Sequence, residues 1–92
     1  MKNSLLSILT DEERLMRAID SANRNAQAFR EVLDSIRSIP VECDTKTADL
    51  AHYEGLIAKY QQEADENRRQ LDAVRDDLKA YITELFKKEI DR

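Results

Sequence analysis

The sequence predicts an all-α protein, an antiparallel two-helix coiled-coil hairpin in which residues 1–92 form a single domain. Three observations lead to this fold class. Apolar residues recur every seven positions in the second half of the chain, at Leu50, Ile57, Ala64, Leu71, Leu78 and Leu85. A similar column precedes the single proline, at Leu15, Ile19, Ala22, Ala26, Phe29, Leu33 and Ile36. One Gly and one Pro leave few turn residues, which excludes a fold of many short strands.

The first long helix is expected over about residues 10–38. Thr10 and Glu13 have the spacing of a capping box, which predicts that the helix begins there. The preceding segment, residues 1–9, contains several apolar side chains and allows a short third helix before the cap.

The turn is expected at residues 39–43 and the second helix at about 44–91. Pro40 cannot donate a backbone hydrogen bond and disfavours helical backbone at the residue before it, so the first helix should end near Ser38. Asp44 is the preferred cap of the second helix, with Thr45 and Thr47 as alternatives.

A short turn makes the two helices antiparallel neighbours, and folding the chain about residues 41 and 42 predicts their register. In that register, alanines of one helix face large residues of the other, as a packed layer requires. The expected pairs are Leu33 with Leu50, Phe29 with Tyr53, Ala26 with Ile57, Ala22 with Tyr60, and Leu15 with Asn67.

Two residues interrupt the pattern of the second helix. Asn67 falls among the apolar positions, where it either fixes the register as a buried polar group or lies at the edge of the contact with its amide in water, which we favour. Gly55 falls on the outward side. There it marks either a close contact with another chain or a tolerated weak point, and we favour the weak point.

The second helix is longer than the first, and its excess length is apolar. Because Leu5 should reach only as far as Leu78, residues 79–92 should extend past the first helix by about 20 Å. Either the N-terminal segment or a second copy of the chain could cover this extension, and both could hold together. The candidate interface for a partner or for self-association comprises Tyr81, Ile82, Leu85, Phe86, Ile90, Leu5, Leu6 and Leu9.

The composition of the chain argues against nucleic-acid and membrane partners and favours a cytoplasmic location. A net charge of −4, with acidic residues among the basic ones, argues against a nucleic-acid surface. No stretch is apolar and long enough to span a bilayer, so a membrane is not an expected partner. The single cysteine cannot form a disulfide within the chain, and we therefore expect a reducing, cytoplasmic location.

The residue types that usually carry chemistry are few and scattered. His52 follows Asp49 by three positions, but it points outward, and Cys43 and His52 are too few ligands for a zinc site. Cys43 has no identifiable base beside it, so an incidental free thiol is expected. We therefore predict no catalytic residue, no metal or other cofactor, and no small-molecule substrate, which makes an enzyme the least favoured class.

The favoured function is a non-enzymatic protein–protein interaction module, acting as a small assembly factor, adaptor or chaperone through apolar helix faces, with a homodimer as the favoured oligomer. One alternative is a small acidic regulator or inhibitor that occludes a target protein. Another is a secreted hairpin. In size and general plan the chain resembles the Trp-X-Gly hairpins of bacterial specialised secretion, but residues 38–44 contain neither Trp nor Gly, so no residue role is implied.

Overall fold

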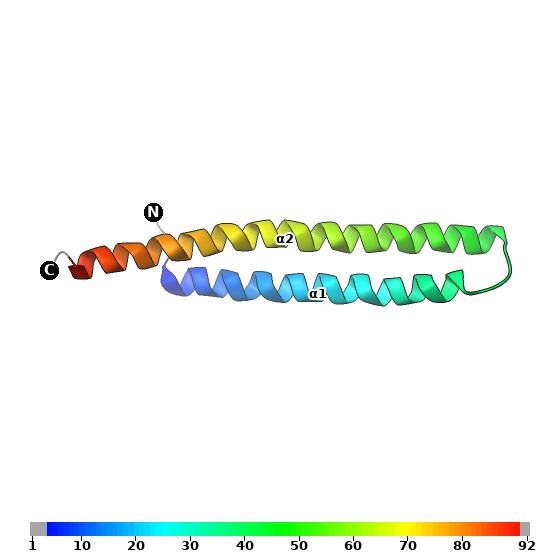
Figure 1. The fold of residues 1–92 in the computed structure, drawn as a ribbon, viewed down its shortest axis with the longest axis horizontal. Coiled ribbons are helices and arrows are strands. Elements are labelled where there is room, and N and C mark those ends of the chain that lie inside the picture. Colours follow the sequence, from blue (N-terminus) through cyan, green and yellow to red (C-terminus); the bar gives the residue numbers. More distant parts are fainter. Residues whose placement is uncertain (1–3, 91–92) are drawn as a thin grey trace.

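The structure, a computed structural model, describes residues 4–90 and contains two long helices. Helix α1 spans Leu5–Arg37 and helix α2 spans Asp44–Ile90. They run antiparallel and side by side, joined by the connection 38–43, in a rod with extents of 75 × 19 × 15 Å (Figure 1). The predicted all-α helical hairpin is confirmed.

The start of the first helix differs from the prediction. Residues 5–9 form the first turns of α1 itself, so neither a separate third helix nor a helix start at Thr10 is present in the described part of the chain. Ser4 caps α1, its side chain accepting a hydrogen bond from the backbone N–H of Ser7 at 3.2 Å. The Thr10 hydroxyl donates to the Leu6 carbonyl at 2.8 Å, as a residue inside a helix can.

The physical reason for the longer α1 is the buried side chain of Ile8. Ile8 lies seven positions before Leu15, so it continues the apolar column of the helix by one more repeat, and only 3% of it is exposed. A capping-box spacing contributes about 1 kcal/mol, a modest term beside the burial of a large aliphatic side chain. Residues 1–3 of the predicted N-terminal segment lie outside the described residues.

Helix α2 starts where the sequence predicts, at Asp44, but Asp44 is its first helical residue rather than its cap. The carbonyl of Cys43 accepts a hydrogen bond from the Thr47 N–H at 3.1 Å, so the chain enters the helix one residue earlier than the cap assignment implies. The Asp44 carboxylate still adds negative charge to the first turn, where the helix dipole favours it. The helix ends at Ile90, and residue 91 lies outside the described residues.

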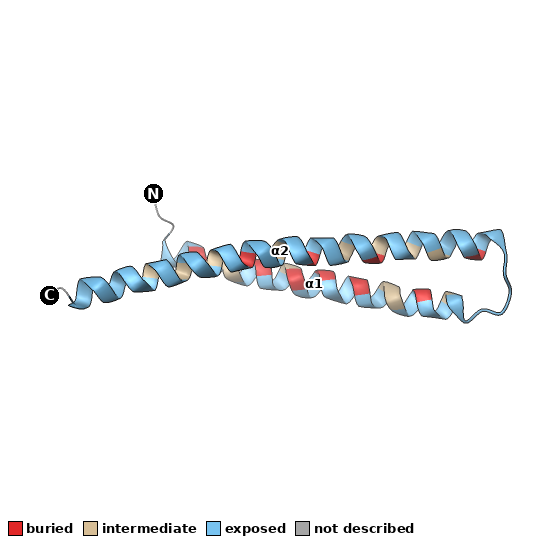
Figure 2. Ribbon diagram, turned by 45° about the horizontal axis from the view of Figure 1, so that its top comes forward, coloured by how far each residue is buried: buried red, intermediate tan, exposed pale blue. Residues whose placement is uncertain are grey.

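The core is a single line of side chains between the helices, visible as buried positions spaced along both (Figure 2). Leu15, Ile19 and Leu71 form one cluster of buried side chains, with Val74 packed against it. Alanines in the line let the two backbones approach. The buried apolar residues are Ile8, Leu15, Ile19, Ala22, Ala26, Leu33, Ile57, Ala64 and Leu71.

The register is displaced from the predicted one. Phe29 does contact Tyr53, as expected, but its ring also stacks on Tyr60, with centroids 5.8 Å apart in each pair. Elsewhere the partners on α2 come later in the chain than predicted. Leu15 packs with Leu71, and Leu33 lies with Ile57 in one groove of the surface.

The displacement follows from the width of the turn. The connection 38–43 swings past the end of α1, and α2 begins farther out before it runs back (Figure 1). Folding the chain about a tight turn therefore gave pairs that are too early on α2. As a result the contact extends past Leu78: Leu78 and Tyr81 are half-buried, and every described residue from Ile82 onward is exposed.

The turn is held by Lys46, whose side chain is only 7% exposed. Its ammonium donates to the Ile39 carbonyl at 2.7 Å and to the Glu42 carboxylate at 2.7 Å. Both acceptors belong to the connection, so Lys46 ties this segment to the first turn of α2. Hydrogen bonding to two acceptors compensates for burying the charge.

Candidate protein-interaction surface

The end of the hairpin opposite the turn, which we call the open end, exposes large apolar side chains from both helices. At this end α2 continues alone past the start of α1 (Figure 1). On α1 the most exposed of these side chains is Leu6, at 76%, and on α2 Phe86 and Ile90 reach 64% and 79%. The exposed set is Leu5, Leu6, Leu9, Met16, Ile82, Leu85, Phe86 and Ile90.

Seven of the eight residues of the predicted interface belong to this exposed set, and Tyr81 is half-buried beside them. The structure brings the α1 and α2 members to the same end of the rod. Met16 was missed by sequence reasoning, although it follows Leu9 by seven positions, a spacing that places both on one side of a helix.

A cross-helix ion pair shows which of these residues share a side of the hairpin. The Arg75 Nε donates to Glu12 Oε2 at 3.3 Å, and Arg75 Nη2 lies 3.9 Å from Met16 Sδ. Arg75, Glu12 and Met16 therefore lie on one side of the hairpin.

Helical spacing extends that side to further residues. Leu5 and Leu9 precede Glu12 and Met16 by seven positions, while Ile82 and Phe86 follow Arg75 by seven and eleven, which is close to two and three full turns. These apolar residues form a surface that we call the open-end face, made of Leu5, Leu9, Met16, Ile82 and Phe86.

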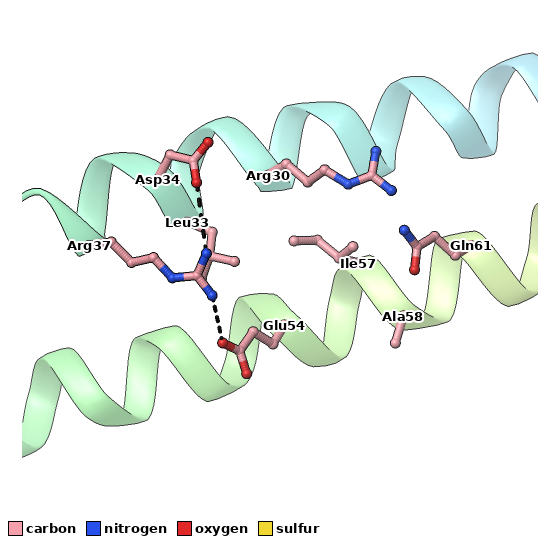
Figure 3. A pocket seen from close by; sticks show the side chains of 8 residues that line it. All are labelled: Arg30, Leu33, Asp34, Arg37, Glu54, Ile57, Ala58 and Gln61. Atoms are coloured by element: carbon pink, nitrogen blue, oxygen red, sulfur yellow. Dashed lines mark hydrogen bonds and ion pairs between the residues drawn. The ribbon is translucent and has the colours of Figure 1, made fainter.

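The same side of the hairpin is polar toward the turn. Steps of seven from Met16 lead to Asn23 and Arg30, and steps of seven back from Arg75 lead to Arg68, Gln61 and Glu54. Arg30, Gln61 and Glu54 do lie together, around one shallow groove (Figure 3). The apolar part of this side is thus confined to the open end.

The groove toward the turn is lined by residues of both helices. Its floor includes Leu33 and Ile57, and Arg37 closes one end by pairing with Glu54 at 3.1 Å and with Asp34 at 3.9 Å (Figure 3). Its charged rim is largely satisfied by these internal pairs. It is open to solvent, and the side chains that line it are not arranged for catalysis. We therefore regard it as a gap between the two helix surfaces and assign it no function.

The residues considered for chemistry remain apart. His52 is exposed and contacts the Tyr53 ring edge-on, with centroids 5.2 Å apart, and Cys43 is exposed in the turn. Within residues 4–90, no group of three or more His, Cys, Asp or Glu side chains is placed to hold a metal ion. Neither α1 nor α2 has a stretch that is apolar and long enough for a bilayer span.

Asn67 is half-buried rather than enclosed, in line with the preferred position at the edge of the contact. Gly55 is exposed, and a Cβ added to it would meet nothing within 4 Å, so no close approach inside the hairpin requires a glycine there. These two interruptions therefore mark no site within the described chain.

Comparison with known proteins gives no match: no family model, no curated protein and no solved structure is similar to this chain.

Proposed function

We propose that this chain is a non-enzymatic protein–protein interaction module, an assembly factor, adaptor or small chaperone that binds its partner through the apolar open end. The observation that carries the proposal is the concentration of exposed apolar side chains at one end of a rod whose middle is polar. Large exposed apolar patches on soluble helical proteins commonly mark contact surfaces, because their burial is favourable by about 25 cal/mol per Å².

The form of the surface suggests how a partner would bind. Residues 82–90 of α2 present Ile82, Leu85, Phe86 and Ile90 on successive turns, with no α1 residue beside them at the far end (Figure 1). An amphipathic helix of the partner could lie along these anchors, which is a recurring mode of helix recognition. We place this activity in the cytoplasm, where an exposed thiol such as Cys43 stays reduced.

The test is recovery of partners from the native cells with a tagged full-length chain. The Leu85→Asp/Phe86→Asp double variant should lose at least about nine-tenths of the partner bound by the wild type, since two charges would enter an apolar contact. Val41→Asp is the matched control, because Val41 at the turn is 62% exposed and Phe86 is 64% exposed. Helicity, measured by circular dichroism, should be retained in all three.

Equal recovery by the wild type and the double variant would contradict the proposal. A partner that survives the double substitution but is released by moderate salt would instead favour the acidic regulator, since the net charge of the chain is −4 and screening weakens exposed charge pairs.

A further inference from the structure

We infer that the open-end face is the interface of a symmetric dimer, in which the face of one chain packs on the same face of a second copy. This inference rests on the proposed function, because it assigns an occupant to the same apolar end. The dimer would have four helices where the open ends overlap and two-helix arms pointing away on either side.

The first argument is the surface area of the chain. A compact monomer of 10.7 kDa exposes about 5,500 Å², whereas this chain exposes 7104 Å². A standard protein interface covers about 800 Å² on each partner. The excess, about 1,600 Å², is twice that area, so one such interface would remove about half of it.

The second argument is the size of the core. Within the described residues, nine apolar side chains are buried, and three of them are alanines. So thin a core buries little apolar surface, and oligomerisation is one way in which a small chain adds to it. A second copy of the chain is present wherever the chain is made. It is therefore the partner most readily available to bury the exposed apolar side chains of the open end.

The third argument is that the face is complementary to itself. A twofold axis places the same patch on both sides of the contact, so a patch with a net charge would repel its copy. Beside the open-end face, Arg75 and Glu12 neutralise one another at 3.3 Å. Helical spacing places one further cation and one further anion on this side, Lys79 and Glu89, so these four charges sum to zero. The polar stretch beginning at Asn23 and Arg68 would limit the overlap to the open end.

The experiment measures the mass of the purified full-length chain by sedimentation equilibrium. The wild type should have twice the 10.7 kDa mass of one chain, and small-angle scattering should give a particle clearly longer than the 75 Å hairpin. The midpoint of thermal unfolding should rise with protein concentration, since dimerisation stabilises by mass action.

The Leu9→Glu/Phe86→Glu variant should raise the dimer dissociation constant by at least about 100-fold, because charges would be buried in the contact. Val32→Glu is the control. Val32 lies on the same helix as Leu9 with a similar exposed fraction, 38% against 43%, but at the turn end. This control should leave the mass at that of a dimer.

A wild-type mass of one chain up to millimolar concentration, or equal dissociation by Val32→Glu, would overturn the dimer. If the double variant fails to fold, the concentration dependence of the wild type still decides. If the chain is a monomer but still recovers partners from cells, the dimer is refuted and the proposed function stands. If the chain is a dimer but recovers no other protein, the proposed adaptor function is refuted and the dimer stands.

Discussion

At the scale of single residues, the buried ammonium of Lys46 sets the shape of the turn. Replacing it with Met keeps the apolar stem but removes both hydrogen bonds, to the Ile39 carbonyl and to the Glu42 carboxylate. We expect the free energy of unfolding in urea to fall by about 2 kcal/mol, the range for hydrogen bonds to charged groups. Lys87→Met, at an exposed lysine of the same helix, should change it by less than about 0.5 kcal/mol. Equal effects would show that Lys46 does not hold the turn.

Gly55 offers a second test at this scale. Because an added Cβ meets nothing within 4 Å and the residue is inside α2, Gly55→Ala should raise the free energy of unfolding by about 1 kcal/mol. Ala51→Gly, at an exposed position one turn earlier, should lower it by a similar amount. A loss of stability in Gly55→Ala would show that the glycine faces a contact with another chain.

At the scale of the elements, the two possible starts of α1 predict opposite results for two substitutions. Ser4→Ala removes the observed cap and should cost about 1 kcal/mol, measured by thermal or urea unfolding. Thr10→Ala removes a hydroxyl bonded inside the helix and should be neutral or slightly stabilising. A larger loss in Thr10→Ala than in Ser4→Ala would restore the capping-box start.

The helices themselves were predictable from the sequence because apolar periodicity fixes which residues face inward. The start of α1 was not, because Thr10 and Glu13 satisfy a local rule that the burial of Ile8 overrides. The register was not either. The register depends on the width of the turn. The hydrogen bond from Lys46 to the Ile39 carbonyl, which shapes the turn, cannot be inferred from the heptad spacing. The one sign of this contact in the sequence was the spacing of four residues between Glu42 and Lys46, which suits an ion pair.

At the scale of the whole molecule, the apolar residues of the open end were foreseen from the unequal helix lengths, but their arrangement on one side was not. The pair between Glu12 and Arg75 joins residues far apart in the chain, and it forms only in the observed register. With that register known, the side of the hairpin that carries this pair is apolar at the open end and polar toward the turn. This division is the basis of the proposed interaction.

The most direct test of the interaction surface is photo-crosslinking in the native cells, with a photoreactive residue placed in turn at Phe86, Asn23 and Val41. All three positions are exposed, and they sample the open end, the middle and the turn. Protein adducts, whether with a second copy or with another protein, should form mainly from position 86 and at background level from position 23. Adducts no more abundant at 86 than at 23 would contradict the account.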